Sequence, residues 1–230
     1  MKFPNAYNGV KKIYLAEVVQ ILAAVMGISL IVVLVANNVT LGAEEMSLEN
    51  MPEILTPVFG IGAACFALIA FILNLFGVMS ARKDDNNFKM AFFAILTGIV
   101  CSIAGAVFNS NESLKHWMEA GGTLGSLFAS YFVLSGIASL AGKYPDNTMM
   151  SLALKARARL AGTFGATVIL QAIVSLFRIP NYTVMSTLCV IIPLMQLVSY
   201  MLYMMTLARC KKMLASAPRR SDGRIGDLAA

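Results

Sequence analysis

Residues 159–209 read RLAGTFGATVILQAIVSLFRIPNYTVMSTLCVIIPLMQLVSYMLYMMTLAR. Two long apolar runs flank a short turn, and each run carries one glutamine deep within it, Gln171 or Gln196. Gln171 stands 12 residues after Arg159, and Gln196 stands 13 residues before Arg209. At a helical rise of about 1.5 Å per residue, both lie roughly 18–20 Å from the basic end, near the middle of a ~30 Å hydrocarbon layer. The stretch therefore predicts a membrane hairpin with two amides at one depth.

The composition of the whole chain supports the same class of protein. Of the 230 residues, 58% are hydrophobic and only 13% are charged, whereas a soluble domain carries about 25% charged residues. The apolar residues form continuous runs of about 20, the length of a transmembrane helix, and do not alternate as barrel strands do. We therefore expect an all-α, polytopic integral membrane protein.

The runs predict six transmembrane helices in one compact domain over residues 13–208. A polar, basic segment, 1–12, precedes this domain, and a basic tail, 209–230, follows it without an apolar period, so we expect the tail to be disordered. We expect a loop over residues 109–122 and a helix over 149–159 that continues into the fifth span. The six spans are predicted at about 13–36, 54–79, 88–108, 123–142, 160–178 and 184–208.

The distribution of basic residues predicts the orientation. Sixteen of the eighteen Lys and Arg residues fall on the side of the termini, and only Lys115 and Arg178 fall on the other. Because basic residues accumulate in cytoplasmic loops, both termini are predicted to be cytoplasmic. We expect a multi-pass protein of a cell membrane, of the bacterial inner-membrane type. These sixteen basic residues also suit an interaction with anionic lipid at the cytoplasmic face. Because they lie beside the spans, they argue against a nucleic-acid partner.

Small residues recur every three or four positions along the predicted spans. Such faces let membrane helices approach closely, because lipid supplies no hydrophobic drive for their association. They predict one packed bundle, and they also allow a membrane protein partner or a homo-oligomer. The faces are Glu17, Gln20, Ala24 and Gly27 in the first span; Gly60, Ala63, Ala67, Ala70, Asn74 and Gly77 in the second; Ala91, Ala94, Gly98, Cys101 and Gly105 in the third; and Gly122, Gly125, Ala129, Gly136 and Ser139 in the fourth.

The fifth and sixth spans carry more polar stripes at the same spacing, and Pro193 is expected to bend the sixth. The stripes have two interpretations, namely hydrogen bonds that hold the helices together and a path that contacts a substrate. Their members are Thr163, Thr167, Gln171 and Ser175 in the fifth span, and Ser186, Cys189, Pro193, Gln196, Tyr200 and Tyr203 in the sixth.

A second polar layer is predicted nearer the cytoplasm. Gln20 and Asn74 each stand eight residues from a basic residue, or about 12 Å along a helix, and Glu17 lies one turn below Gln20. We expect the first two spans to form hydrogen bonds across this layer. Glu17 itself is either a carboxylate at the interface or a proton or cation site.

No motif for catalysis, metal or cofactor binding occurs in the sequence. The cysteines, Cys65, Cys101, Cys189 and Cys210, are isolated, and we interpret them as buried free thiols. The single histidine, His116, has no second ligand at metal spacing, and there is neither an H-E-x-x-H motif nor a Walker A motif. We expect no cofactor and favour a non-enzyme.

Two functions remain. The first is a small permease or transport-accessory subunit with a polar path along the fifth and sixth spans. The alternative is a non-catalytic scaffold or regulatory protein that binds partners through its small-residue faces. The first predicts a water-accessible cavity that reaches Gln171 or Gln196, and the second predicts a closed bundle.

Overall fold

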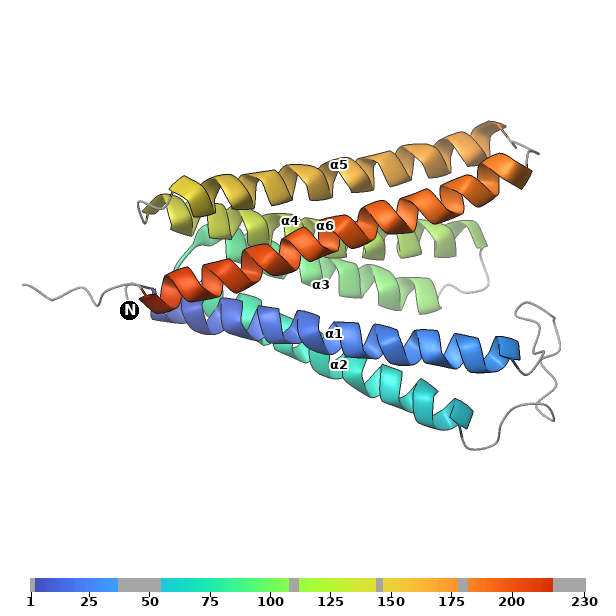
Figure 1. The fold of residues 1–230 in the computed structure, drawn as a ribbon, viewed down its shortest axis with the longest axis horizontal. Helices are drawn as coiled ribbons and strands as arrows, with labels where there is room; N and C mark the ends of the chain where they lie inside the picture. Colours follow the sequence, from blue (N-terminus) through green and yellow to red (C-terminus); the bar gives the residue numbers. More distant parts are fainter. Residues whose placement is uncertain (1–2, 37–54, 108–111, 144–146, 178–181, 217–230) are drawn as a thin grey trace, which may run out of the picture. The chain divides into compact units, whose positions relative to one another are not determined.

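The computed structural model describes residues 3–36, 55–107, 112–143, 147–177 and 182–216. Within these ranges some side chains lie outside the described part, the longest such segments being 167–177 and 182–196. The described chain is helical throughout and contains no strand, which confirms the all-α class (Figure 1). Its helices are α1 (Pro4–Ala36), α2 (Leu55–Ala81), α3 (Asn86–Val107), α4 (Glu112–Lys143), α5 (Asn147–Phe177) and α6 (Tyr182–Ser216).

Four helices of the described chain are long and apolar enough to cross a membrane. Their apolar windows lie in Pro4–Leu30 of α1, Val58–Ala81 of α2, Asn86–Val107 of α3 and Ala120–Lys143 of α4. Over half of the α4 window, 56%, is buried within the protein, compared with 6% of the α2 window. The membrane character predicted from composition is therefore confirmed, and the α4 window is largely buried whereas little of the α2 window is.

The prediction that the fifth span is preceded by a continuous helix is confirmed, because α5 runs unbroken from Asn147 to Phe177. The expected loop over residues 109–122 is wrong from Glu112 onward, since α4 begins there. Residues 112–120 are rich in good helix formers. The following glycines continue the helix because they lie against α3: a Cβ at Gly121 would stand 3.0 Å from Cys101 Sγ, and one at Gly122 would stand 2.8 Å from Ser102 Oγ.

The ends of the chain are more helical than expected. The polar, basic segment 1–12 belongs to α1 from Pro4 onward, and Pro4 occupies the first helical position, where proline is tolerated. The predicted disordered tail is helical as far as Ser216. This extension has an apolar period after all, since Cys210, Met213 and Leu214 are buried against the protein. Residues 217–230 lie outside the described chain.

The chain divides into two compact units. Unit 1 comprises Met1–Lys11 and Val78–Ala230, and unit 2 comprises Lys12–Gly77. Within unit 2, two glycines of α2 lie near α1: a Cβ at Gly60, which belongs to the predicted small-residue face, would lie 3.8 Å from Leu30, and one at Gly62, which does not, would lie 2.8 Å from the terminal methyl of Met26. The opposite face of α2 is exposed and apolar, as at Leu68, which is 59% exposed. The predicted first-span face is wrong at Ala24, which is exposed, whereas Ala23 is buried.

Unit 1 contains the tightest helix contact, between α3 and α4. A Cβ at Gly125 would stand 2.7 Å from Gly98 Cα and 3.0 Å from the Ala94 carbonyl oxygen, so the two backbones touch where both residues lack side chains. Nearer one end of the pair, the ring of Phe88 lies against Gly136, where a Cβ would stand 2.6 Å from a ring carbon. The small-residue faces predicted for the third and fourth spans are confirmed as the contact surface.

Candidate functional site

One end of unit 1 gathers most of its charged side chains. We call it the basic end; it consists of the start of α1, the α2–α3 turn, the end of α4, the start of α5 and the end of α6. In the turn, Asp84 caps α1 from outside that helix. Its Oδ2 accepts a 2.6 Å hydrogen bond from the Ala6 backbone N–H, and its Oδ1 accepts one of 3.1 Å from Asn5 Nδ2. Ser80 Oγ donates to the Asn5 carbonyl oxygen at 3.2 Å. A helix start with free N–H groups favours such an anionic partner.

Asp85, the next residue, joins α3 to α4. Its Oδ1 accepts bonds from the backbone N–H and the side-chain amide of Asn87 at 3.0 and 2.8 Å, which makes it the N-cap of α3. Its Oδ2 accepts bonds from Ser139 Oγ at 2.6 Å and from Lys143 Nζ at 2.8 Å. Burial alone would raise the pKa of Asp85, but these hydrogen bonds outweigh it, so the pKa lies below its ordinary value of 3.8. The carboxylate is therefore ionised and structural.

Arg157 of α5 extends toward α4. It donates a 3.3 Å hydrogen bond to Ser135 Oγ, and its guanidinium carbon lies 5.2 Å from the centre of the Tyr131 ring. Ser135 is buried, and Arg157 is itself partly buried. Within the described chain no carboxylate pairs with this cation, so the aromatic face and the hydroxyl stabilise it instead. The contact fastens α5 to the central helix.

The interface between α5 and α6 contains a polar contact among its described side chains. The hydroxyls of Thr163 and Ser199 lie 3.1 Å apart and share a hydrogen bond across the interface. Ser199 and Thr206 are buried polar residues on the α6 face that also carries Tyr203. The rings of Tyr200 and Tyr203 lie 6.5 Å apart. A line of polar groups thus runs along α6 as it passes α5.

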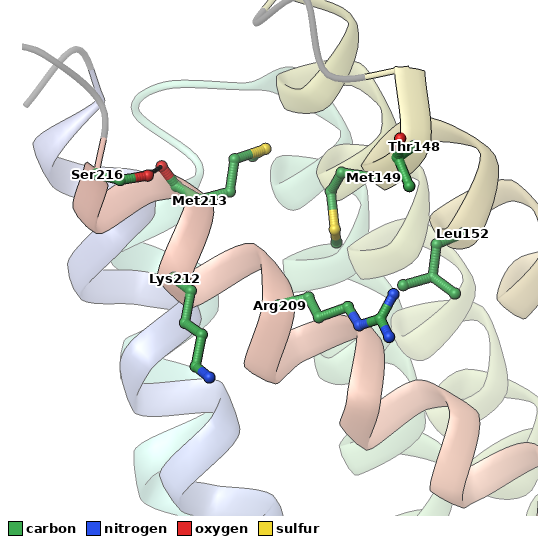
Figure 2. A pocket seen from close by; sticks show the side chains of 7 residues that line it. All are labelled: Thr148, Met149, Leu152, Arg209, Lys212, Met213 and Ser216. Atoms are coloured by element: carbon green, nitrogen blue, oxygen red, sulfur yellow. Dashed lines mark hydrogen bonds between the residues drawn. The ribbon is translucent and has the colours of Figure 1, made fainter.

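The basic ends of α5 and α6 border a recess of about 350 Å³ (Figure 2). Arg209 reaches from α6 toward Leu152 of α5, and Met213 extends toward Met149 (Figure 2). The lining residues, all in the described chain, include two cations and no carboxylate. They are Thr148, Met149 and Leu152 from α5, and Arg209, Lys212, Met213 and Ser216 from α6.

Comparison with protein-family models, curated proteins and solved structures finds no match. The function of this chain must therefore be inferred from its own residues.

The described contacts set the alignment of α5 against α6. Thr163 lies opposite Ser199, and Leu152 lies opposite Arg209 in the recess. Arg209 is thus level with Leu152, seven residues before Arg159, so the assumption that Arg159 and Arg209 mark one level is wrong. It fails because Arg209 stands 29 residues from Pro180 in the predicted turn, whereas Arg159 stands only 21 residues from it.

This alignment changes the expected depth of the two glutamines. Gln171 stands eight residues beyond Thr163, and Gln196 stands three residues beyond Ser199 in the same direction. The difference of five residues corresponds to about 7.5 Å along the helix axis. The side chains of both glutamines lie outside the described part, so a contact between them stays a prediction.

The other predicted site residues are distributed as follows. Tyr203 is buried, and Tyr200 is partly buried beside it. In unit 2, Glu17 and Asn74 are partly buried and Gln20 is exposed, and hydrogen bonding across this predicted layer stays a prediction. The side chains of Thr167 and Ser175 lie outside the described part.

The predicted burial of the thiols holds for Cys210, which is fully buried, and is wrong for Cys65, which lies on the exposed face of α2. Cys101 is partly buried against α4, and the side chain of Cys189 lies outside the described part. Within the described ranges, no three His, Cys, Asp or Glu side chains gather as metal ligands would.

Sequence reasoning missed the residues that organise the basic end. For Asp85 a signal was present, because an Asp directly before a possible helix start is an N-cap signal. The spacing of Ser199, Tyr203, Thr206, Cys210 and Met213 by four and three would have shown that one buried face of α6 crosses the predicted span boundary. The contact between Arg157 and Tyr131 left no signal in the sequence.

Proposed function

We propose that the protein crosses the membrane six times with both termini in the cytoplasm, in a bacterial inner membrane. The support is the distribution of basic residues, sixteen of eighteen on the side of the termini, together with four helices whose length and composition suit a membrane. In addition, α5 and α6 are 31 and 35 residues long, which exceeds the ~20 residues that a span requires. The basic end of unit 1 is then the cytoplasmic end.

Within this topology, we propose a small permease or transport-accessory subunit whose polar path follows α5 and α6. The observation that carries the proposal is the hydrogen bond between Thr163 and Ser199. It places polar groups at the α5–α6 interface between the recess and the depth of the glutamines. Polar side chains in membrane helices face the protein interior or a water-filled cavity and mark substrate paths.

Cysteine accessibility tests the path. The native cysteines are replaced, and the single variants Thr163→Cys and Tyr203→Cys are prepared in inside-out membrane vesicles. A membrane-impermeant thiol reagent then reaches the cytoplasmic face directly. If water enters along α5 and α6, both positions are labelled at rates near that of a surface site. Leu68→Cys, on the exposed apolar face of α2, is the matched control and should stay unlabelled within lipid.

The contradictory outcome is equally clear. If Thr163→Cys and Tyr203→Cys resist the reagent as Leu68→Cys does, while Lys83→Cys in the α2–α3 turn reacts, the interface is dry and the permease proposal fails.

The topology has its own test: a reporter active only in the cytoplasm should work when fused after Ala230 and fail when inserted within residues 44–53. The reverse pattern would overturn the orientation.

A scaffold or regulatory protein is the second candidate, and one observation favours it. An apolar face of α2 is exposed, with Ile61 and Leu68 exposed by 64% and 59%. Such a surface suits either lipid or a membrane partner. The dry outcome of the cysteine experiment would favour this function over transport.

We further propose anionic lipid as a partner at the cytoplasmic face. Each basic residue close to a negatively charged leaflet contributes about 1 kcal/mol of attraction, and the described basic end exposes Lys83, Lys89, Arg209 and Lys212.

A further inference from the structure

We propose that the recess between α5 and α6 is a specific site for the phosphate-bearing headgroup of an anionic membrane phospholipid. The inference rests on the cytoplasmic orientation proposed above and deepens it, because it assigns lipid recognition to one cavity. It does not depend on whether the protein transports a substrate.

The charge of the recess points to an anion. Arg209 and Lys212 line it, and no carboxylate of the described chain pairs with either of them. This contrasts with Lys143 at the same end, whose amine lies 2.8 Å from Asp85. Arg209 has the planar donor geometry that suits phosphate, and its guanidinium extends across the recess toward Leu152 (Figure 2). Lys212 also lines the recess, although its amine points away from the Arg209 guanidinium (Figure 2).

Hydroxyl groups complete a polar half of the recess. Thr148 lies in the first turn of α5, where the helix start carries partial positive charge. Ser216 donates its hydroxyl proton to the Met213 carbonyl at 3.0 Å, so its oxygen can still accept a bond from a glycerol hydroxyl. The polar half thus offers a cation and a hydroxyl to a phosphate and its alcohol substituent.

The remaining lining is apolar, which distinguishes a lipid from a soluble anion. Met149, Leu152 and Met213 form this half, and methionine side chains adapt to irregular apolar ligands. A free phosphate would leave these three side chains unused. A phospholipid would place its phosphate at Arg209 and the start of its acyl chains on the methionines and the leucine.

The depth of the recess also fits a headgroup. If the hydrocarbon edge on α6 lies at Ala208, the predicted span end, Arg209 stands about 1.5 Å outside it. If the edge is instead set by Leu160 of α5, which is level with Leu202, Arg209 stands about 10 Å outside it. The headgroup layer extends roughly 5–7 Å outward from the hydrocarbon core, so Arg209 lies within this layer in the first case and just beyond it in the second.

The test is a lipid titration of the purified full-length chain in a neutral detergent, followed by thermal unfolding and native mass spectrometry. Phosphatidylglycerol should raise the unfolding temperature and appear as a bound lipid. The variant Arg209→Gln/Lys212→Gln should bind it at least roughly tenfold more weakly, because two cations at about 1 kcal/mol each are lost. The control Lys83→Gln/Lys89→Gln removes the same charge from exposed positions of the same end. Because neutral detergent provides no anionic leaflet and neither lysine lines the recess, this variant should bind within about threefold of the wild type.

Three outcomes would overturn the proposal. Equal weakening in both double variants would mean diffuse attraction without a site. Equal binding of phosphatidylcholine would mean that the site does not recognise the net charge of the headgroup. Equal stabilisation by soluble glycerol 3-phosphate would mean a site for a free anion. If the recess variant does not fold, Leu152→Phe, which fills the recess without changing charge, carries the same titration, and unchanged lipid binding by it would refute the site.

Failure here is distinguishable from failure of the permease proposal. The lipid titration uses no cysteine labelling, and the labelling of Thr163→Cys does not require Arg209 or Lys212. A protein that binds phosphatidylglycerol in the recess and stays dry along α5 and α6 would support the lipid site and refute the transport path.

Discussion

The α3–α4 pair and the α5–α6 pair lie in the same unit and carry similar residue types, but they are closed in different ways. The α3–α4 pair is joined by backbone at Gly98 and Gly125, and its charged end is paired through Asp85 and Lys143. The α5–α6 pair is joined by hydroxyls at Thr163 and Ser199, and its charged end opens into a recess.

The two pairs differ in whether their charged side chains already have charged partners within the described protein. Asp85 satisfies a helix start, a hydroxyl and an amine at once, so a ligand would have to displace intramolecular bonds. Arg209 has no carboxylate partner among the described residues and reaches across a cavity (Figure 2). A ligand there gains a charge interaction without breaking one, which is why we place binding at α5–α6 and stability at α3–α4.

The largest expected effect comes from the closed pair. Gly125→Leu forces a side chain into the backbone of Gly98, with the first added carbon already 2.7 Å from Gly98 Cα, and should lower the free energy of unfolding by ~3 kcal/mol or more. Gly162→Leu is the matched control, because nothing lies within 4 Å of a Cβ there. Denaturation in detergent compares the two, and equal losses would show that α3 and α4 do not touch at this point.

Asp85→Ala should have the next largest effect. It removes the N-cap of α3 and the bonds from Ser139 and Lys143, and we expect a loss of about 2–3 kcal/mol in the free energy of unfolding. Lys143→Gln removes only the partner that is 47% exposed and should cost about 0.5 kcal/mol. If Lys143→Gln lowers the free energy of unfolding as much as Asp85→Ala does, the ion pair and not the N-cap is the main contribution of Asp85 to stability.

Acid should reproduce part of the Asp85→Ala effect. Because the pKa of folded Asp85 is depressed below 3.8, its stabilisation is complete above the unfolded value and is lost as the pH falls through the folded value. The difference in unfolding free energy between wild type and Asp85→Asn should therefore be constant above about pH 5 and shrink below about pH 3.8. A difference that stays constant down to about pH 2 would contradict the assigned hydrogen bonds.

The hydroxyl contact of the α5–α6 pair should contribute less. Thr163→Val and Ser199→Ala are each expected to cost about 0.6 kcal/mol, and the double variant should cost less than their sum. Strict additivity in this double-mutant cycle would show that the two hydroxyls do not share a bond.

The smallest effect on stability is expected at the recess. Arg209 is exposed, so Arg209→Gln in lipid-free detergent should change the free energy of unfolding by no more than about 0.5 kcal/mol. A loss as large as that of Asp85→Ala would mean that Arg209 has a structural role, and the contrast between the two helix pairs would disappear.

The sequence by itself determined that the chain is helical and of membrane character, because both properties follow from local composition and run length. It also determined which faces of α3 and α4 pack, since small residues spaced by three and four can meet only on one side of a helix. The continuous helix from Asn147 into the fifth span was predictable for the same local reason.

The tertiary structure decided the features that depend on residues distant in sequence. The start of α1 is capped by Asp84, which lies 78 residues from Ala6, so the residues around Pro4 do not reveal what caps that helix. The relative alignment of α5 and α6 depends on side-chain contacts such as Thr163 with Ser199, and counting from basic residues missed it by several positions. Periodicity specifies which face of a helix is buried but not how far the helix slides along its neighbour, and that slide is what brings Arg209 level with Leu152 and forms the recess.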